Sequence, residues 1–331
     1  MNTIEKMVNS AKNAMTYVMD LESSDKVLVV TDEATKSIGE SFHTAARDKG
    51  CESDLYFLME YVRPLREVPA EMEEMLENKT VVINVFKAMS DETPFRVKWV
   101  KKIVATHAIR LGHGPGITDT MMIEGPMNVD YDSMLNRAQS LMKEFEGALS
   151  VRVTAPGGTD ISLGIEKRDF STDVKISTEH FGNLPCGEIW CAPIETTANG
   201  VIVCDGSIGD IGQVTEPVSL KIENGRIINF ECDDVELLET VRRLISIDDD
   251  ASIIGELGVG LNPGAKLSGN LLEDEKAFRT AHIAFGNNEE MTGGQNRSQT
   301  HRDFLFYNPT FVVTFSDGSK KVLIRDGDIQ I

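Results

Sequence analysis

The feature that most constrains this chain is a change in the spacing of its apolar residues near residue 148. Before that point, strand-length apolar runs alternate with amphipathic segments of helix length, which predicts βαβ units and a mainly parallel sheet. After it, short strand-like segments follow one another and are separated by turn sequences. The predicted fold class is therefore α/β plus α+β, with an N-terminal α/β domain at residues 1–148 and a C-terminal strand-rich domain at residues 149–331.

The first domain is expected to alternate strands with helices. Its predicted strands are 26–30, 54–59 and 80–86, and its predicted helices are 4–18, 34–49, 69–78, 95–109 and 130–147. The last of these helices carries apolar residues three and four positions apart, which gives it one face to bury. Gly50 is a typical C-terminal stop for the second helix.

The second domain is expected to be mostly antiparallel. Its predicted strands are 150–154, 161–165, 200–203, 218–222, 227–232, 311–315 and 321–324, with one helix at 235–245. Residues 223–226 (Glu-Asn-Gly-Arg) and 316–319 (Ser-Asp-Gly-Ser) are hairpin turn sequences, since Asn-Gly and Asp-Gly favour left-handed backbone.

Charge and composition exclude several classes of function. The net charge is -20 and the pI is near 4.7, so the chain repels phosphate backbones and we expect no nucleic-acid partner. No apolar run approaches the roughly 18 residues of a membrane span, and Glu5 and Lys6 interrupt any apolar signal core. Five scattered cysteines do not form a disulfide framework. We therefore expect a cytoplasmic protein that does not enter a membrane.

The region from residue 255 to residue 304 points to metal chemistry. It contains Glu256, His282, His301 and Asp303 among glycines and asparagines. Imidazole nitrogens and carboxylate oxygens are ligands that divalent first-row metals accept. If His301–Asp303 is extended, its first and third side chains point to the same face and can hold one ion. The competing interpretation of each histidine alone is a hydrogen-bonded structural residue.

Glu188 raises the same question further upstream. It lies in an apolar segment after Pro185 and Gly187, where a buried carboxylate is costly unless it is paired or bound to an ion. Glu256 also sits among apolar residues. The alternative for both is a partly exposed carboxylate at the start of a strand.

Taken in order, several short motifs resemble the metalloaminopeptidases of the aminopeptidase T and aminopeptidase S type, a leucyl aminopeptidase-like family. The matching segments are Gly116–Thr118, Val151–Thr154, Gly158–Asp160, Asn183–Glu188, Gly255–Asn262, Asp274–Lys276, His282–Gly286, Gly293–Asn296 and His301–Asp303. They cover most of residues 110–305, and they are specific as an ordered series rather than one by one.

This resemblance implies a two-metal centre in the second domain that activates water for removal of the N-terminal residue of small peptides. Carried over position by position, the implied metal ligands are Glu188, Glu256, His282, His301 and Asp303. The implied cofactors are divalent ions (zinc, cobalt or manganese), and the implied assembly is a homodimer. Whether Glu188 or Glu256 bridges the ions or acts as the base stays open, so no catalytic residue is assigned.

Two other functions remain open at this point. His282, His301 and Asp303 alone form a two-histidine, one-carboxylate set that suits mononuclear non-haem iron(II), as in a ring-cleaving dihydroxypyridine dioxygenase of the same broad fold family. The lack of a tyrosine between the two histidines favours that alternative, whereas the presence of Glu188 and Glu256 favours two ions. A relative that binds metal without catalysis is the third possibility.

Overall fold

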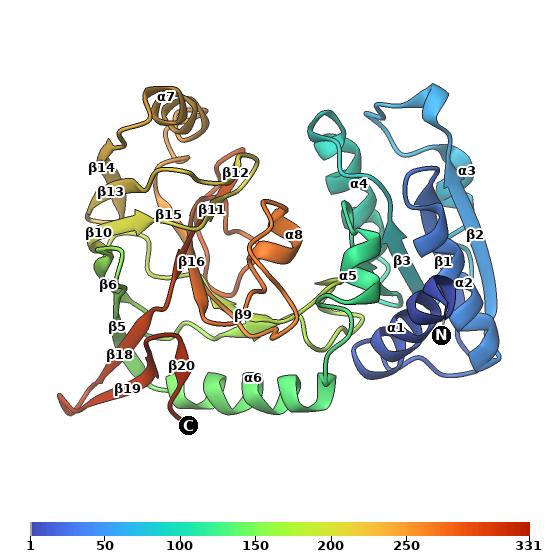
Figure 1. Ribbon diagram of the computed structural model, residues 1–331, viewed down its shortest axis with the longest axis horizontal. Helices are drawn as coiled ribbons and strands as arrows, with labels where there is room; N and C mark the ends of the chain where they lie inside the picture. The colour runs from blue at the N-terminus through green and yellow to red at the C-terminus, as the bar shows by residue number, and fades with distance from the viewer. Residues whose placement is uncertain (1) are drawn as a thin grey trace. The chain divides into compact units, whose positions relative to one another are not determined.

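The structure is a computed structural model that describes residues 2–331, and the chain divides into two compact units. The first unit runs to Leu135 and also includes Asp173–Cys186 and Pro263–Ala265. The second unit comprises Asn136–Thr172, Gly187–Asn262 and Lys266–Ile331. A parallel sheet in the first unit and strand-rich antiparallel sheets in the second confirm the predicted fold class (Figure 1).

The first unit is built on a five-stranded sheet in the order β2-β1-β3-β4-β8, in which every neighbouring pair is parallel. Its strands are β1 (Lys26–Asp32), β2 (Glu52–Leu58), β3 (Val81–Val85), β4 (Arg110–His113) and β8 (Gly182–Asn183). β1 and β3 are buried along nearly their whole length, as expected for parallel strands with both faces covered.

Helices and helical turns precede and connect these strands. They are α1 (Thr3–Tyr17), α2 (Lys36–Lys49), η1 (Glu60–Val62), α3 (Ala70–Glu74), η2 (Ser90–Glu92), α4 (Thr93–Val104) and α5 (Asp119–Ile123), with α6 (Tyr131–Phe145) following. Asn2 and Glu5 form a capping box at the start of α1. Gly50 ends α2 in the left-handed conformation, with φ 97°, as its sequence position predicted.

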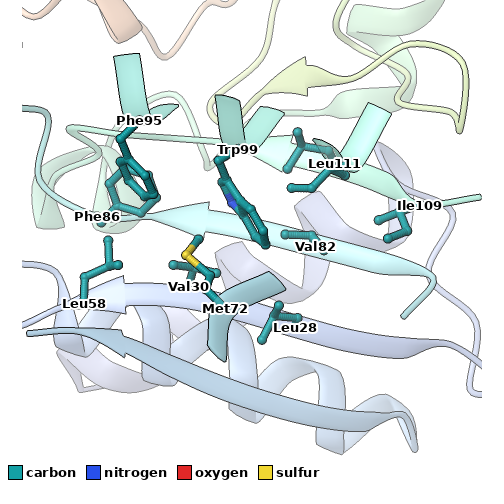
Figure 2. Close-up of a cluster of buried hydrophobic side chains, with 11 residues drawn as sticks. Leu28, Val30, Leu58, Met72, Val82, Phe86, Phe95, Trp99, Ile109 and Leu111 are labelled. Carbon is teal, nitrogen blue, oxygen red and sulfur yellow. The ribbon is translucent and has the colours of Figure 1, made fainter. Parts of the chain in front are cut away.

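One face of the parallel sheet is covered by an apolar cluster. Alternate residues Leu28 and Val30 of β1 point to this face, where Phe95 and Trp99 of α4 are fully buried (Figure 2). The indole nitrogen of Trp99 donates a hydrogen bond to Asn84 at 3.0 Å, which satisfies a polar group inside the core.

Two predicted helices are shorter in the structure. The helix predicted at 69–78 ends at Glu74, because the chain continues in tight turns and Asn78 takes a left-handed φ of 62°. The helix predicted at 95–109 spans Thr93–Val104, and His107 beyond its end also has a positive φ, of 51°. In both cases the local turn conformation stops the helix before the apolar pattern does.

The second unit contains two antiparallel sheets. The eight-stranded sheet has the order β14-β13-β10-β6-β5-β18-β19-β20. Its strands are β5 (Ala148–Thr154), β6 (Asp160–Gly164), β10 (Asn199–Cys204), β13 (Val218–Glu223), β14 (Arg226–Glu231), β18 (Thr310–Phe315), β19 (Lys320–Arg325) and β20 (Asp328–Ile329). The two predicted hairpins are confirmed, because β13 pairs with β14 and β18 pairs with β19.

The seven-stranded sheet has the order β12-β11-β17-β16-β15-β9-β7. Its strands are β7 (Ser171–Thr172), β9 (Glu188–Cys191), β11 (Ser207–Ile208), β12 (Gly212–Gln213), β15 (Ile254–Gly260), β16 (Thr280–Gly286) and β17 (His301–Tyr307). The unit also contains helices α7 (Val235–Leu244) and α8 (Leu271–Asp274). The four adjacent strands β17, β16, β15 and β9 carry the site described next.

Among residues 2–331, no helix combines the length and the apolar character that crossing a bilayer requires.

Candidate metal centre

The five predicted ligands lie on four neighbouring strands of the seven-stranded sheet. Glu188 begins β9, Glu256 is in β15, His282 is in β16, and His301 and Asp303 are in β17. Residues 301–303 are extended, which meets the condition for His301 and Asp303 to point to the same face.

The strand register places all five side chains on one face of the sheet. Glu256 and Asp303 both pair with Ala284, and residues paired across antiparallel strands point to the same side. His282 and His301 each lie two residues from a member of that row, and so share its face. Glu188 joins them through its pairing with Gly260, which is four residues beyond Glu256. Alternation along each strand therefore brings together groups that are far apart in the sequence.

Small residues on the same face leave room for these side chains. Gly258 pairs with His282, and a Cβ atom at Gly258 would lie only 1.9 Å from the imidazole Nε2. Ala284 stands between the two carboxylates with which it pairs. A larger side chain at either position would compete with the imidazole and carboxylate groups for space.

Glu256 is the centre of the arrangement. Its Oε1 lies 3.3 Å from His282 Nε2, and its Oε2 lies 3.0 Å from His301 Nε2. Glu188 Oε2 lies 3.5 Å from His282 Nε2, and Asp303 Oδ1 lies 3.6 Å from His301 Nε2. Two groups result, each with ligand atoms within 4.8 Å of one another: Glu188 with Glu256 and His282, and Glu256 with His301 and Asp303.

The burial of these groups is uneven. Glu188, Glu256, His282 and Asp303 are buried, whereas the side chain of His301 is 32% exposed. Its Nδ1 donates a hydrogen bond to the carbonyl oxygen of Asn287 at 2.7 Å. Since a carbonyl oxygen can only accept, this bond fixes a proton on Nδ1 and leaves Nε2 of the neutral ring free to bind a cation.

The electrostatic field at the site is strongly negative. Burial would lower the pKa of His282, but its hydrogen bond to Glu256 and the surrounding carboxylates raise that pKa to about 9. Burial likewise opposes protonation of His301, yet the charge of Asp303 raises its pKa well above the ordinary value. Burial would raise the pKa of Glu256, and hydrogen bonds from both imidazoles lower it instead. A site that favours positive charge this strongly is suited to cations.

Sequence reasoning did not assign two further charged residues of the site. Lys276 is fully buried, and its ammonium donates hydrogen bonds to the carboxylates of Glu188 and Glu275. Burial and the charge of Asp303 raise the pKa of Glu275, and Lys276 opposes that rise. Both residues follow α8 directly, in a segment that the family resemblance had singled out. The available signal was a lysine next to the apolar pair Ala277-Phe278.

The chain is similar to proteins described as metalloproteases and aminopeptidases. The sequence profile described as "Thermophilic metalloprotease (M29)" matches residues 129–329, which is more than half of the chain. Aminopeptidase AmpS of Bacillus subtilis (strain 168) is 22% identical over 269 residues, covering 74% of this chain and 62% of that protein. Aminopeptidase T of Thermus thermophilus is 28% identical over 193 residues, covering 51% of this chain and 46% of that protein. The chain thus spans less than two thirds of the length of these curated relatives.

Two solved structures share the fold. Wild-type AmpT of Thermus thermophilus superposes with a TM-score of 0.76 at 16% identity, covering 99% of both chains. The 2,5-dihydroxypyridine dioxygenase of Pseudomonas putida KT2440 superposes with a TM-score of 0.75 at 15% identity, covering 98% of this chain and 96% of that chain. At these identities the likeness is one of fold, and it does not favour the dioxygenase alternative.

Proposed function

Because this chain belongs to the thermophilic metalloprotease (M29) family, we propose that it is a metal-dependent aminopeptidase that removes the N-terminal residue of peptides at a two-ion centre. The observation that carries the proposal is the position of Glu256, whose two oxygens face different imidazoles. One carboxylate can therefore serve two cations. Both aminopeptidase relatives support peptides as the substrate class.

The residues present fit two divalent ions. Glu188, Glu256 and His282 would hold one ion, and Glu256, His301 and Asp303 the other. Oxygen and imidazole donors suit zinc, cobalt and manganese, and two such groups sharing a carboxylate are typical of two-metal hydrolases. When bound, the ions would lower the pKa of a water molecule and polarise the scissile carbonyl group.

The proton of that water needs an acceptor outside the ligand set. We assign this role to Glu275, which is partly buried beside the cluster and interacts electrostatically with His282 and Asp303. Lys276 holds one Glu275 oxygen at 2.6 Å and so orients the carboxylate. Glu275 would take the proton and return it to the leaving amine. The acidic surroundings would attract the positively charged N-terminus of a peptide.

The dioxygenase and the non-catalytic metal-binding relative are the competing functions. A mononuclear iron(II) centre needs only His282, His301 and Asp303, and it leaves the buried Glu188 and Glu256 without a role. Family membership supports hydrolysis over oxygen chemistry.

The test is metal stoichiometry together with turnover. The purified protein would be loaded anaerobically with cobalt, zinc, manganese or iron(II), analysed for metal per chain, and assayed against aminoacyl p-nitroanilides, dipeptides and dihydroxypyridines. Two ions per chain with amide hydrolysis are expected. One iron with ring cleavage would establish the dioxygenase instead. Bound metal with no turnover of the peptide substrates or of the dihydroxypyridines would support a metal-binding protein without catalysis.

The variant Glu188→Gln distinguishes a loss of metal-dependent activity from a loss of folding. It replaces one oxygen ligand with an amide of the same shape, so we expect amide hydrolysis to fall well before the circular dichroism spectrum changes. Normal hydrolysis in this variant would argue against a two-ion mechanism that uses Glu188.

We also retain as proposals the division into domains at residues 1–148 and 149–331, a homodimeric assembly, and a cytoplasmic location. The five cysteines are free thiols in the structure, which suits a reducing compartment. Light scattering of the purified protein would test the dimer.

A further inference from the structure

We propose that Lys276 makes the two ion-binding groups unequal, so that the chain binds one ion tightly at the group of His301 and Asp303 and a second ion more weakly at the group of Glu188. This inference rests on the proposed two-ion centre. It concerns the order and affinity of metal binding rather than turnover, and it gives the buried lysine the role of a positioning residue.

The first step is the contact between Lys276 and Glu188. The lysine side chain is fully buried, and its ammonium donates to Oε1 of Glu188 and, at 2.6 Å, to Oε1 of Glu275. The other oxygen of Glu188 faces His282 Nε2 at 3.5 Å. An ion in this group would therefore receive a single oxygen from Glu188, and it would lie close to a fixed positive charge that has no lone pair to offer.

The second group has no such competitor. Within the described residues, the ion-pair partner of Asp303 is His301, and no lysine or arginine pairs with it. Nε2 of His301 is presented by the hydrogen bond from Nδ1 to the carbonyl of Asn287. Both protein ligands that are specific to this group are thus available to an incoming ion.

The balance of charge also makes the second ion bind more weakly than the first. Among the contacts described above, the four carboxylates of Glu188, Glu256, Glu275 and Asp303 are accompanied by one ammonium, that of Lys276. With both imidazoles neutral the cluster carries four negative charges and one positive charge, which leaves a net charge of about -3. The first divalent ion reduces this to about -1, so the second ion meets a much weaker attraction and also the nearby ammonium.

The inequality can be measured by titrating metal-free protein with Co²⁺, using visible absorption and calorimetry. Wild type should show two binding events whose dissociation constants differ at least about tenfold, since groups next to metal ligands change affinity about 10–100-fold. Asp303→Ala should remove the tight event, and His282→Ala should remove the weak one. Lys276→Met, which keeps the chain length and removes the charge, should tighten the weak event about 10–100-fold.

Two companion variants control for folding and for charge. Lys276→Arg keeps the positive charge and should keep two unequal events. The double variant Lys276→Met/Glu275→Gln removes one charge of each sign, so it leaves no added net charge in the cluster. It should still tighten the weak event, because the oxygen of Glu188 is released from the ammonium.

The possible outcomes separate this inference from the proposed function. Two equal binding events in wild type, or a weak event that is unchanged in both the Lys276→Met variant and the double variant, would overturn the role of Lys276 and leave the two-ion centre standing. Fewer than two ions in wild type and in every variant that keeps the five ligands would overturn the two-ion centre, and the inequality with it.

Discussion

Each unit of the molecule buries a cluster of charged side chains, and the two clusters are neutralised to different extents. In the first unit, Arg63 is almost fully buried between the carboxylates of Asp32 and Glu92. Asp32 also accepts hydrogen bonds from the Lys87 amide and from Thr35, and Glu92 accepts one from the Leu65 amide. In the second unit, the ammonium of Lys276 contacts the carboxylates of Glu188 and Glu275, and these lie with Glu256, Asp303 and two imidazoles.

This difference in neutralisation distinguishes a structural charge cluster from a candidate binding site. Around Arg63, the guanidinium and neighbouring backbone amides supply the donors that the two carboxylates need, so the cluster is complete within the protein. Around Glu256, the imidazoles provide the missing positive charge only by becoming protonated, as the raised pKa values of His282 and His301 indicate. A cation can replace those protons, whereas nothing in the first cluster needs replacing.

The largest effect expected from this comparison follows from breaking the complete cluster. Arg63→Met leaves two buried carboxylates without their partner and should lower the free energy of unfolding by about 3–5 kcal/mol. Urea denaturation would measure the loss. Arg152→Met is the matched control, because Arg152 forms an exposed pair with Asp160 and its loss should leave the stability almost unchanged. Metal content should be unchanged in both variants. A loss of metal in Arg63→Met would contradict the purely structural role of the first cluster.

Breaking the second cluster should reduce metal binding and leave the stability of the fold largely unchanged. Asp303→Ala removes a direct ligand and should weaken metal binding by about a hundredfold or more, beyond the effect of groups that only support a ligand. His301→Ala should behave in the same way. Elemental analysis and circular dichroism would show metal lost and the fold retained. Asp317→Ala, in an exposed hairpin turn, is the control. Full metal retention in both ligand variants would reject the site.

A smaller effect is expected from filling the space beside His282. The added methyl group of Gly258→Ala would lie 1.9 Å from Nε2, so the imidazole must move and metal affinity should fall about 10–100-fold. Val259→Ala, the next residue and on the opposite face of β15, should cost stability and leave affinity intact. Equal affinities in the two variants would mean that the ring does not depend on this glycine.

The smallest expected effect is the dependence of stability on pH, which tests the charge pairing in the first cluster. Burial opposes ionisation of Asp32 and Glu92, but hydrogen bonds from Lys87 and Arg63 lower the pKa of Asp32, and those from Arg63 and Leu65 lower that of Glu92. The pKa values of Asp32 and Glu92 in the folded protein lie below the ordinary 3.8 and 4.5. The two ionised carboxylates therefore stabilise the fold fully at a pH above these ordinary pKa values. This stabilisation is lost as the pH falls through the lower pKa values of the folded protein.

Acid denaturation followed by circular dichroism would test this. Wild type should lose stability as the pH falls below about 4, where carboxyl groups of ordinary pKa become protonated. Arg63→Met should lose less over the same range because its carboxylates are already uncompensated. An equal loss in wild type and variant would show that this cluster does not set the acid limit.

How far the sequence predicts this molecule depends on the range of the interactions involved. The α/β pattern follows from local periodicity and is confirmed, and the same-face placement of His301 and Asp303 follows from an extended chain at 301–303, which the structure has. Strand order in the sheets and the role of Gly258 could not be predicted, because they depend on which strands pair and in what register. Glu188 and Glu256 entered the candidate site by their unusual apolar surroundings and by family resemblance. Lys276 lies next to the apolar pair Ala277-Phe278, but that signal alone does not show its contact with Glu188, 88 residues away in sequence.

The common sheet face of the five ligand candidates has one more consequence. A one-residue slip of β17 would turn both of its donors to the reverse side and bring Arg302 and Phe304 to the face of Glu256 instead. Ion binding by these five groups would therefore require the correct strand alignment. A divalent cation present during refolding would act as a template that selects the right pairing, and the yield of ion-binding chains would report how faithfully the sheet had assembled.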